Sequence, residues 1–324
     1  MKILVTGGAG FIGSHLVERL VALNNEIMIL DDFSAGVDEN LKELKGKAVE
    51  VVKGTIANQE IVNYCVKDVD KIFHLGAKTN IDESLLFPHL FDEVNSRGTL
   101  NILVAAKERN VPVLQMSTSE VYGSALKAPI DEDHPLNPQS PYAASKVAAE
   151  RYCYSFISSY GSPIIIIRSF NNYGPRQKGN VHYGGLIARN IIRVLLNVPP
   201  VIRGGEQTRD YLFVKDTVEG LIAASNKNSC YGKVLNLGTG LDYSARQIIS
   251  MILEIRGSKL MPEYEDARAG DVQRLICDYK SAYEELGWKP RYDLKKGLEE
   301  TLNWYEANLQ RYRDYVFPSF KQKL

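Results

Sequence analysis

Features that are scarce in this 324-residue sequence already exclude several classes of protein. It has only four cysteines, far apart at positions 65, 153, 230 and 277, and their spacing fits neither a metal site nor a disulfide framework. Lys plus Arg equals Asp plus Glu at 39 each, so the formal net charge is zero. A broad basic face for nucleic acid is therefore not expected. We predict reduced thiols, no metal and no nucleic-acid partner.

Long apolar runs are also missing. No run approaches the roughly 20 residues that a membrane-spanning helix needs. The chain leads from Met1 directly into a predicted strand, with no signal peptide, and it has no internal repeat or low-complexity tract. We therefore expect a cytoplasmic protein with no membrane partner. Hydrophobic residues make up 44% of the chain, which at this length can form a sizeable core.

The first half of the chain alternates short apolar runs with amphipathic segments. Strands are apolar throughout and alternate with helices, which is typical of a parallel sheet covered on both faces. The fold class predicted is α/β, a Rossmann-type doubly wound parallel sheet. The expected strands cover 2–6, 26–30, 48–52, 71–75, 112–117 and 162–168, and the expected helices 12–23, 59–66, 95–108 and 142–160.

After residue 170 the pattern becomes shorter and mixed, as expected of a smaller, intertwined C-terminal substrate-binding lobe. Residues 1–170, with a returning segment near 211–238, are predicted to form the sheet domain, and 171–210 with 239–324 the second lobe. In this half we expect a loop over 171–183, strands at 201–202, 211–214 and 234–237, and helices at 184–197, 217–225, 245–256, 280–286 and 294–309.

A glycine cluster follows the first predicted strand, in the sequence TGGAGFIG from Thr6 to Gly13. Glycines 8, 10 and 13 fit the spacing G-x-G-x-x-G, and glycines 7, 10 and 13 fit G-x-x-G-x-x-G. In either register glycine permits a tight turn, close approach of a pyrophosphate and close packing of the next helix. The N-terminus of that helix offers free N–H groups to the phosphates. The cluster predicts a dinucleotide site.

The second predicted strand ends at Asp31-Asp32. A carboxylate there can accept hydrogen bonds from the ribose hydroxyls and would repel a 2′-phosphate, and no Arg follows in the turn, so the pair favours NAD. Asp31 is preferred over Asp32. The alternative is a structural glycine turn with two solvated acids, but strand, helix and acid all stand where a cofactor site needs them.

Two further segments carry chemistry. Tyr142 and Lys146 are four apart on a predicted helix and so share a face. The ammonium should lower the pKa of the phenol from about 10 and make it a usable base. Thr118 and Glu120 follow a buried strand, at the carboxyl edge where ligands bind in such folds. Thr118 could bond a reacting oxygen. Glu120 could act as a second acid or base, or it could be an ordinary loop carboxylate. For Tyr142 and Lys146 the alternative is an exposed pair on a helix with no catalytic role.

Six segments occur in the order typical of one family. The set resembles the extended short-chain dehydrogenase/reductase family, the NAD-dependent nucleotide-sugar epimerases and dehydratases, from Met1 to about Trp304. The segments are TGGAGFIG from residue 6, HLGAK from 74, STSEVYG from 117, SPYAASK from 140, RSFNNYGPRQ from 168 and RDYLFVKD from 209.

The resemblance implies that NAD stays bound and is recycled within each turnover. Tyr142 would take the proton of the sugar 4-hydroxyl, with Lys146 as modulator and ribose ligand and Thr118 sharing the hydrogen bond to the 4-oxygen. Asn95, at a helix start, would support the network on the cofactor side. The implied cofactor-binding residues are Gly7, Gly10, Phe11, Ile12, Gly13, Asp31, Thr55, Ile56, Leu75, Gly76, Ala77, Lys78, Asn95, Ser117, Tyr142 and Lys146.

The choice among possible reactions depends on the triplet Thr118-Ser119-Glu120. It resembles the triplet of the GDP-mannose dehydratases and the NDP-GlcNAc dehydratases. An acid there can remove the C5 proton once C4 is a ketone, so we predict a 4,6-dehydratase with Ser119 in the catalytic set. Epimerases usually carry a small or hydroxylic residue at position 120, whereas UDP-glucuronate decarboxylases share the triplet; both stay open. A silent NAD-sensing protein is not favoured because Tyr142 and Lys146 are both present.

The predicted substrate is a nucleotide-activated hexose. Arg suits its diphosphate because the guanidinium makes paired, charge-assisted hydrogen bonds. Thr55, Gly76, Lys78 and the segment 182–185, with His182 in it, depart from the family pattern, and they leave base and sugar open. By family analogy we expect a homodimer through the helices at 95–108 and 142–160. The implied substrate residues are Asn80, Asn171, Asn172, Arg176, Arg209 and Arg268.

Overall fold

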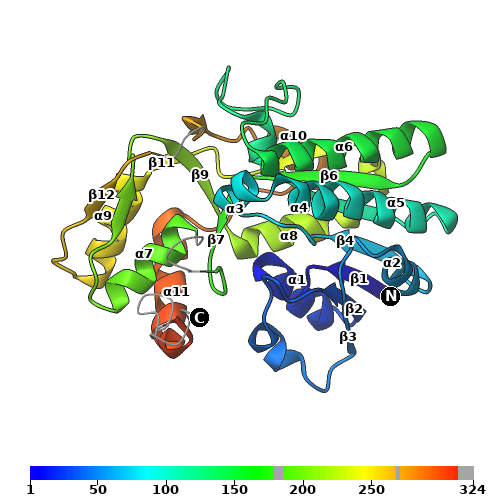
Figure 1. Ribbon diagram of the computed structural model, residues 1–324, viewed down its shortest axis with the longest axis horizontal. Helices are drawn as coiled ribbons and strands as arrows, with labels where there is room; N and C mark the ends of the chain where they lie inside the picture. The colour runs from blue at the N-terminus through cyan, green and yellow to red at the C-terminus, as the bar shows by residue number, and fades with distance from the viewer. Residues whose placement is uncertain (179–184, 268–270, 313–324) are drawn as a thin grey trace.

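A seven-stranded parallel sheet forms the centre of the molecule, in the order β10-β6-β5-β4-β1-β2-β3 (Figure 1). This computed structural model describes residues 1–178, 185–267 and 271–312. The chain winds outward from β1 in both directions, which confirms the predicted doubly wound α/β fold. The strands are β1 (Lys2–Thr6), β2 (Glu26–Asp31), β3 (Val49–Lys53), β4 (Lys71–His74), β5 (Val113–Thr118), β6 (Ile164–Ser169) and β10 (Val234–Leu237).

Helices cover both faces of this sheet (Figure 1). Within β1, Ile3 and Val5 join one buried cluster while Leu4 joins the other, as the two-residue period of a strand requires. Both faces are therefore apolar. The first face is covered by α1 (Phe11–Ala22), α8 (Val214–Ser225) and α10 (Lys280–Leu286), and the second by α2 (Gln59–Val66), α5 (Gly98–Glu108) and α6 (Pro141–Tyr160).

The smaller lobe has its own apolar cluster and two small sheets. One sheet joins β9 (Thr208–Phe213) to β7 (Asn171–Tyr173), β11 (Asp242–Ser244) and β13 (Arg274–Leu275), and the other pairs β8 (Val201–Arg203) with β12 (Glu263–Glu265). Its helices are α7 (Leu186–Leu195), α9 (Ala245–Arg256) and α11 (Leu294–Ala307). Because β10 returns to the main sheet beside β6, the chain passes from one lobe to the other and back. The predicted domain boundaries stay a prediction.

Several segments differ from expectation, and two of them contain predicted site residues. The start of the expected loop 171–183 is a strand, β7, because its backbone pairs with β9. Asn95 does not stand at a helix start: helical structure begins upstream with α3 (Ile81–Leu86) and α4 (Pro88–Phe91), and Asn95 lies in a π-helical turn, Asp92–Arg97, that leads into α5. Single π turns inside helices are frequent at functional sites. Short 3₁₀ helices lie at Asp38–Leu44, Ser119–Tyr122, Asn228–Cys230 and Leu309–Tyr312.

Helix α6 carries Tyr142 and Lys146 and is capped at both ends. The Ser140 hydroxyl accepts a hydrogen bond from the Ala143 N–H, and Pro141 occupies the first turn. Gly161 ends the helix in the left-handed conformation, with φ of 65°. These two ends fix which residues of the helix reach the end of β5. Within the described ranges, no helix combines the length and apolar character needed to cross a membrane.

Candidate functional site

A cleft of about 770 Å³ lies at the carboxyl ends of the central strands, with walls from both lobes. Ligands bind at this edge in doubly wound folds. Of the predicted site residues, Asn95 lies behind the cleft wall and Arg268 lies outside the described residues. The others all line the cleft: Gly7, Gly10, Phe11, Ile12, Gly13, Asp31, Thr55, Ile56, Leu75, Gly76, Ala77, Lys78, Asn80, Ser117, Thr118, Ser119, Glu120, Tyr142, Lys146, Asn171, Asn172, Arg176 and Arg209.

The glycine turn is packed so tightly that side chains are excluded. Gly7 has a φ of +71°, and a Cβ on it would lie 2.9 Å from the Gly76 nitrogen. A Cβ on Gly13 would collide with the Gly7 carbonyl. Helix α1 begins after Gly10, where no side chain of the described residues caps it, and its first turn holds no acid. Its N-terminal N–H groups are thus open to an anion, and the turn fits a dinucleotide pyrophosphate.

Asp31 is held by the backbone around that turn. One carboxylate oxygen accepts from the Ala9 N–H at 2.9 Å and the other from the Phe33 N–H at 2.8 Å. Burial nevertheless raises the pKa of Asp31 above its usual range. Asp32 instead accepts from the N–H and hydroxyl of Ser34, within its own turn. The geometry is consistent with the preference for Asp31 as the ribose acceptor.

The Tyr142 phenol stands beside the Thr118 side chain, with which it is hydrogen-bonded. Burial raises the pKa of Tyr142 to about 12, and the Glu120 carboxylate raises it further, whereas the bond to Thr118 lowers it. The predicted lowering by Lys146 is therefore wrong for this structure. The main reason is burial of the phenol, and the Lys146 ammonium donates to the Met116 carbonyl at 2.7 Å. Burial lowers the pKa of that ammonium to about 8.

Glu120 and Ser119 lie in the short 3₁₀ turn that follows β5. The Thr118 hydroxyl caps this turn by accepting from the Glu120 N–H at 3.2 Å. Glu120 lines the same cleft as Thr118 and Tyr142, and its charge raises the pKa of the Tyr142 phenol. Thr118, Glu120 and Tyr142 therefore form one cluster at the end of β5.

A buried network that the sequence did not predict stands behind this cluster. The Ser117 hydroxyl donates to Glu150 at 2.6 Å, and Glu150 pairs with Arg168 at 2.7 Å. Arg168 also donates to the Tyr122 hydroxyl at 2.9 Å. Glu150 is four residues beyond Lys146 on α6, and its charge raises the pKa of that lysine against the effect of burial. The helical spacing of Glu150 from Lys146 was the only available sequence signal.

At the substrate end of the cleft, two arginines form ion pairs with carboxylates of the same chain. Arg209 pairs with Asp271 at 2.8 Å, and Arg176 pairs with Glu18 at 2.6 Å. The Asn172 side chain donates to the Ser169 hydroxyl and the Phe170 carbonyl at 2.9 Å each. Sequence reasoning missed Arg189, Arg203 and Gln207, which also line this end and belong to no motif.

Several buried polar atoms at this end have no hydrogen-bond partner within the described part of the chain. They are Oδ1 of Asn171, Nη1 of Arg176 and Oε1 of Gln177, and all three residues line the cleft. Buried polar groups are normally bonded, so such atoms mark a place for a polar ligand. Their donors and acceptors suit a sugar diphosphate.

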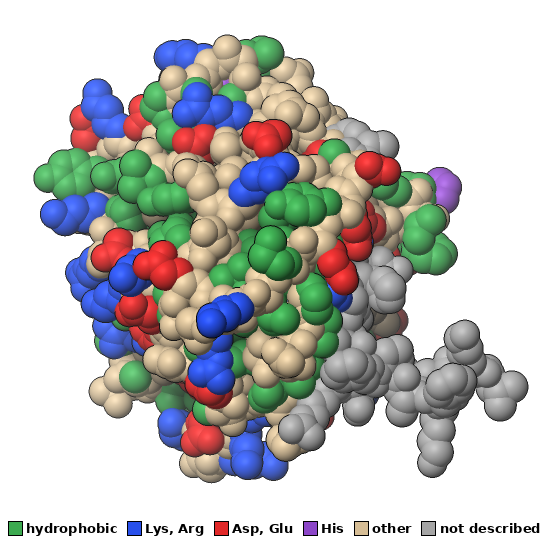
Figure 2. Space-filling model, turned by 90° about the vertical axis from the view of Figure 1, so that its left-hand side faces the viewer, with side chains coloured by type: hydrophobic (Ala, Val, Ile, Leu, Met, Phe, Trp, Pro, Cys, Tyr) green, Lys and Arg blue, Asp and Glu red, His purple; other side chains and the backbone are tan. Residues whose placement is uncertain are grey.

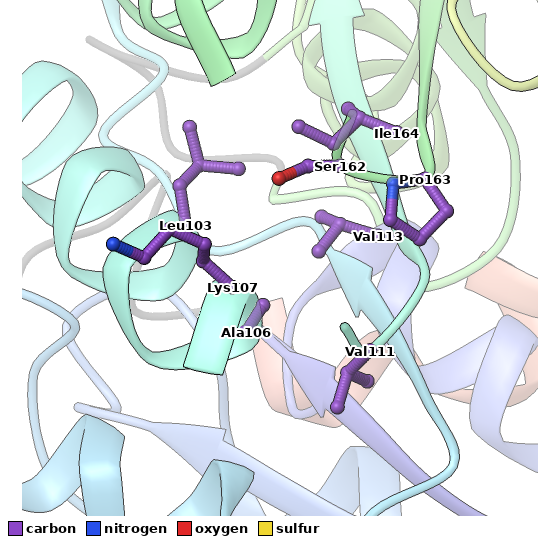
Figure 3. Close-up of a pocket in the computed structure, with 8 residues that line it drawn as sticks. All are labelled: Leu103, Ala106, Lys107, Val111, Val113, Ser162, Pro163 and Ile164. Atoms are coloured by element: carbon purple, nitrogen blue, oxygen red, sulfur yellow. The ribbon is translucent and has the colours of Figure 1, made fainter. Parts of the chain in front are cut away.

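The opposite edge of the sheet offers a contrast. A shallow crevice there is lined mainly by apolar side chains of α5 and of the segments that enter β5 and β6 (Figure 3). Its cation, Lys107, lies over the Tyr160 ring at 4.5 Å. On the face of the molecule shown in Figure 2, acidic and basic side chains are interspersed. Lys107 is the one titratable side chain among the described residues that line this crevice, whereas the cleft at the carboxyl edge is lined by several, including Glu120, Tyr142 and Lys146.

Comparison with known proteins agrees with this site. The family model for GDP-mannose 4,6 dehydratase matches residues 4–301. A putative UDP-glucose 4-epimerase of Methanocaldococcus jannaschii is 37% identical over 94% of this chain and 99% of its own. The UDP-glucuronic acid decarboxylase 1 of Xenopus tropicalis is 31% identical over 95% of this chain and 73% of its own.

Among solved structures, a dTDP-glucose 4,6-dehydratase of Streptomyces venezuelae with NAD bound is 30% identical, with a TM-score of 0.92, over 97% of this chain and 100% of that one. The fold, the ordered motifs and these matches agree with the resemblance drawn from the sequence. The chain therefore belongs to the family of GDP-mannose 4,6 dehydratase-like enzymes, the nucleotide-sugar dehydratases, epimerases and decarboxylases of the extended short-chain dehydrogenase/reductase type.

Proposed function

We propose that this enzyme is an NAD-dependent 4,6-dehydratase of a nucleotide-activated hexose. The observation that carries the proposal is the carboxylate of Glu120 beside Thr118 and Tyr142 at the end of β5. An acid at this point has a task in elimination, whereas 4-epimerisation needs only oxidation, rotation of the sugar and reduction.

The cofactor is NAD, in agreement with the cofactor-bound dehydratase of similar fold. The glycine turn and Asp31 would hold its pyrophosphate and adenosine ribose, and Lys146 its other ribose. Bound NAD⁺ supplies the hydride acceptor and a positive charge that favours the phenolate of Tyr142.

The chain's own residues would move the protons. Tyr142 would take the proton of the 4-hydroxyl while Thr118 bonds the same oxygen, which leaves a ketone at C4 once hydride has left C4. The ketone acidifies the C5 proton, and Glu120 would remove it. Glu120 would then return this proton to the C6 hydroxyl, which leaves as water, and hydride returns to C6 as C5 takes a proton from solvent. The 4-keto-6-deoxy product is lighter than the substrate by one water.

The substrate's diphosphate would lie between Arg209 and Arg176. Each guanidinium is already oriented by an acid, and Nη1 of Arg176 still needs a partner. Arg268 is proposed as a further substrate-binding residue only because it matches a family position. The nucleobase and the hexose stay open.

The test is incubation of the purified enzyme with a panel of nucleotide hexoses in deuterated water, followed by mass spectrometry and NMR. We expect loss of one water and deuterium at C5. An epimer of unchanged mass would contradict the proposal in favour of a 4-epimerase, for which the 37% identical relative provides a precedent. Release of carbon dioxide from a nucleotide uronate would favour a decarboxylase.

Substitution Glu120→Gln tests the role of the acid directly. We expect it to abolish elimination while NADH still forms transiently, because oxidation at C4 needs Tyr142 and not Glu120. Glu93→Gln makes the same change at an exposed position outside the cleft and should leave turnover unchanged. Normal turnover by Glu120→Gln would contradict the proposed elimination.

The predicted homodimer would use α5 and α6. These helices expose Val104, Tyr152 and Tyr160, with 37%, 38% and 56% of their surface accessible. Light scattering of the full chain should give twice the monomer mass. A monomer at micromolar concentration would contradict the proposed dimer.

A further inference from the structure

His74 is a buried histidine that the proposed chemistry does not use. It ends β4 directly beneath the cleft and is 1% exposed. Burial lowers its pKa to about 3, and the positive charge of Lys146 acts in the same direction, so the ring is neutral at neutral pH. In a neutral imidazole one ring nitrogen donates and the other accepts.

The hydrogen-bond partners decide which nitrogen donates. The Thr99 hydroxyl donates its single proton to the Asn95 carbonyl at 2.6 Å, so toward His74 it can only accept. It lies 3.1 Å from Nε2, which must therefore carry the proton. Nδ1 then accepts from the Thr6 hydroxyl, 2.6 Å away. The Thr6 oxygen in turn accepts the Gly76 N–H at 2.9 Å.

One end of this chain of hydrogen bonds supports the cofactor side of the cleft. Thr6 is the last residue of β1, immediately before Gly7. The backbones of Gly7 and Gly76 pack so closely that no Cβ fits between them. A shift of Thr6 or Gly76 would therefore displace the wall on which a dinucleotide is expected to lie.

The other end supports the catalytic helix. Asn95, which receives the Thr99 bond at its carbonyl, donates from its side chain to the Ser145 hydroxyl at 2.9 Å. Ser145 donates to the Tyr142 carbonyl at 2.7 Å. The Asn95 side chain also bonds the Lys78 backbone in both directions, at 2.7 and 2.9 Å.

We propose that His74, as the neutral Nε2–H tautomer, is a positioning residue that holds the glycine turn and Asn95 in one fixed register. It couples the cofactor side to the catalytic helix, because Nδ1 bonds Thr6 beside the glycine turn and Nε2 bonds Thr99, which holds Asn95. This role rests on the proposed NAD-dependent oxidation. It does not depend on whether the product is a dehydrated sugar or an epimer.

The first test is nitrogen-15 NMR of the full chain with labelled histidine, with His74→Gln used to assign the signal. We expect the shifts of a neutral ring protonated on Nε2, unchanged between pH 5 and 8. A ring protonated on Nδ1, or on both nitrogens, would overturn the proposal. This readout is independent of activity, so it separates failure of the proposal from failure of the proposed function.

The second test uses a matched pair at Thr99. Thr99→Val keeps the side-chain shape but removes the acceptor for His74 and the donor to Asn95, whereas Thr99→Ser keeps both. We expect Thr99→Val to weaken NAD binding and to lower kcat, each by about tenfold, and Thr99→Ser to behave like the parent enzyme. If Thr99→Val changes only the melting temperature, or only one of the two constants, coupling through His74 is wrong.

Discussion

The two ends of the cleft differ in how many of their polar groups already have partners. At the cofactor end, both oxygens of Asp31 accept backbone hydrogen bonds, and the Gly76 N–H is bonded by Thr6. At the substrate end, polar atoms of Asn171, Arg176 and Gln177 are buried with no hydrogen-bond partner in the described chain. Apart from the N–H groups at the start of α1, the polar groups of the cofactor end are thus bonded within the protein, whereas the substrate end keeps buried polar atoms that we propose its ligand completes.

The largest effect should come from Gly13→Ala, which acts on the cofactor end alone. Its Cβ would collide with the Gly7 carbonyl, and relief requires the turn to move. Overpacking of about 3 kcal/mol corresponds to about 100-fold weaker NAD binding, which calorimetry measures directly. Gly257→Ala, at the end of α9 and outside the cleft, is the control, because its Cβ would meet no atom within 4 Å and NAD affinity should stay unchanged. Equal NAD affinity in the two variants would contradict the idea of a rigid, preformed turn.

A smaller effect, confined to the substrate end, is expected of Arg209→Met. It removes a buried cation that pairs with Asp271 and that we propose binds the diphosphate. Loss of a charge-assisted contact should raise KM for the nucleotide sugar about 10- to 100-fold, while calorimetry shows unchanged NAD affinity. The control, Arg109→Met, breaks an exposed pair with Asp68 and should change neither constant. If Arg209→Met weakened NAD as much as substrate, the two ends would not be separable.

What could be predicted from the sequence follows the same division. The strands of the main sheet and the glycine turn were predicted within a residue or two, because fully buried parallel strands and phosphate-binding turns have local signatures. The strand β7 was not predicted. Its pairing with β9 joins residues about 40 positions apart, and no local pattern encodes that contact.

The electrostatics of the site could not be predicted either. The pKa of Tyr142 depends on its burial and on Glu120, and Lys146 turns to the Met116 carbonyl instead of the phenol. The pair formed by Glu150 and Arg168 joins a helix to a strand and appears only once the two pack together. Residue types and spacing identified the catalytic set, but their protonation depends on the assembled fold.

The smallest expected effect separates two neighbouring asparagines. Oδ1 of Asn171 has no hydrogen-bond partner among the described residues, whereas the Asn172 side chain donates to Ser169 and Phe170 and accepts from Thr217. Asn171→Ala should therefore leave the melting temperature unchanged and raise KM for the nucleotide sugar about fivefold, the loss of one hydrogen bond of about 1 kcal/mol. Asn172→Ala should instead lower the free energy of unfolding by about 1–3 kcal/mol, because it leaves buried partners without bonds. Thermal unfolding and steady-state kinetics on the two variants check both expectations. Equal destabilisation by the two substitutions would show that Asn171 is already satisfied within the protein, and the contrast between a preformed cofactor end and a ligand-completed substrate end would be lost at that position.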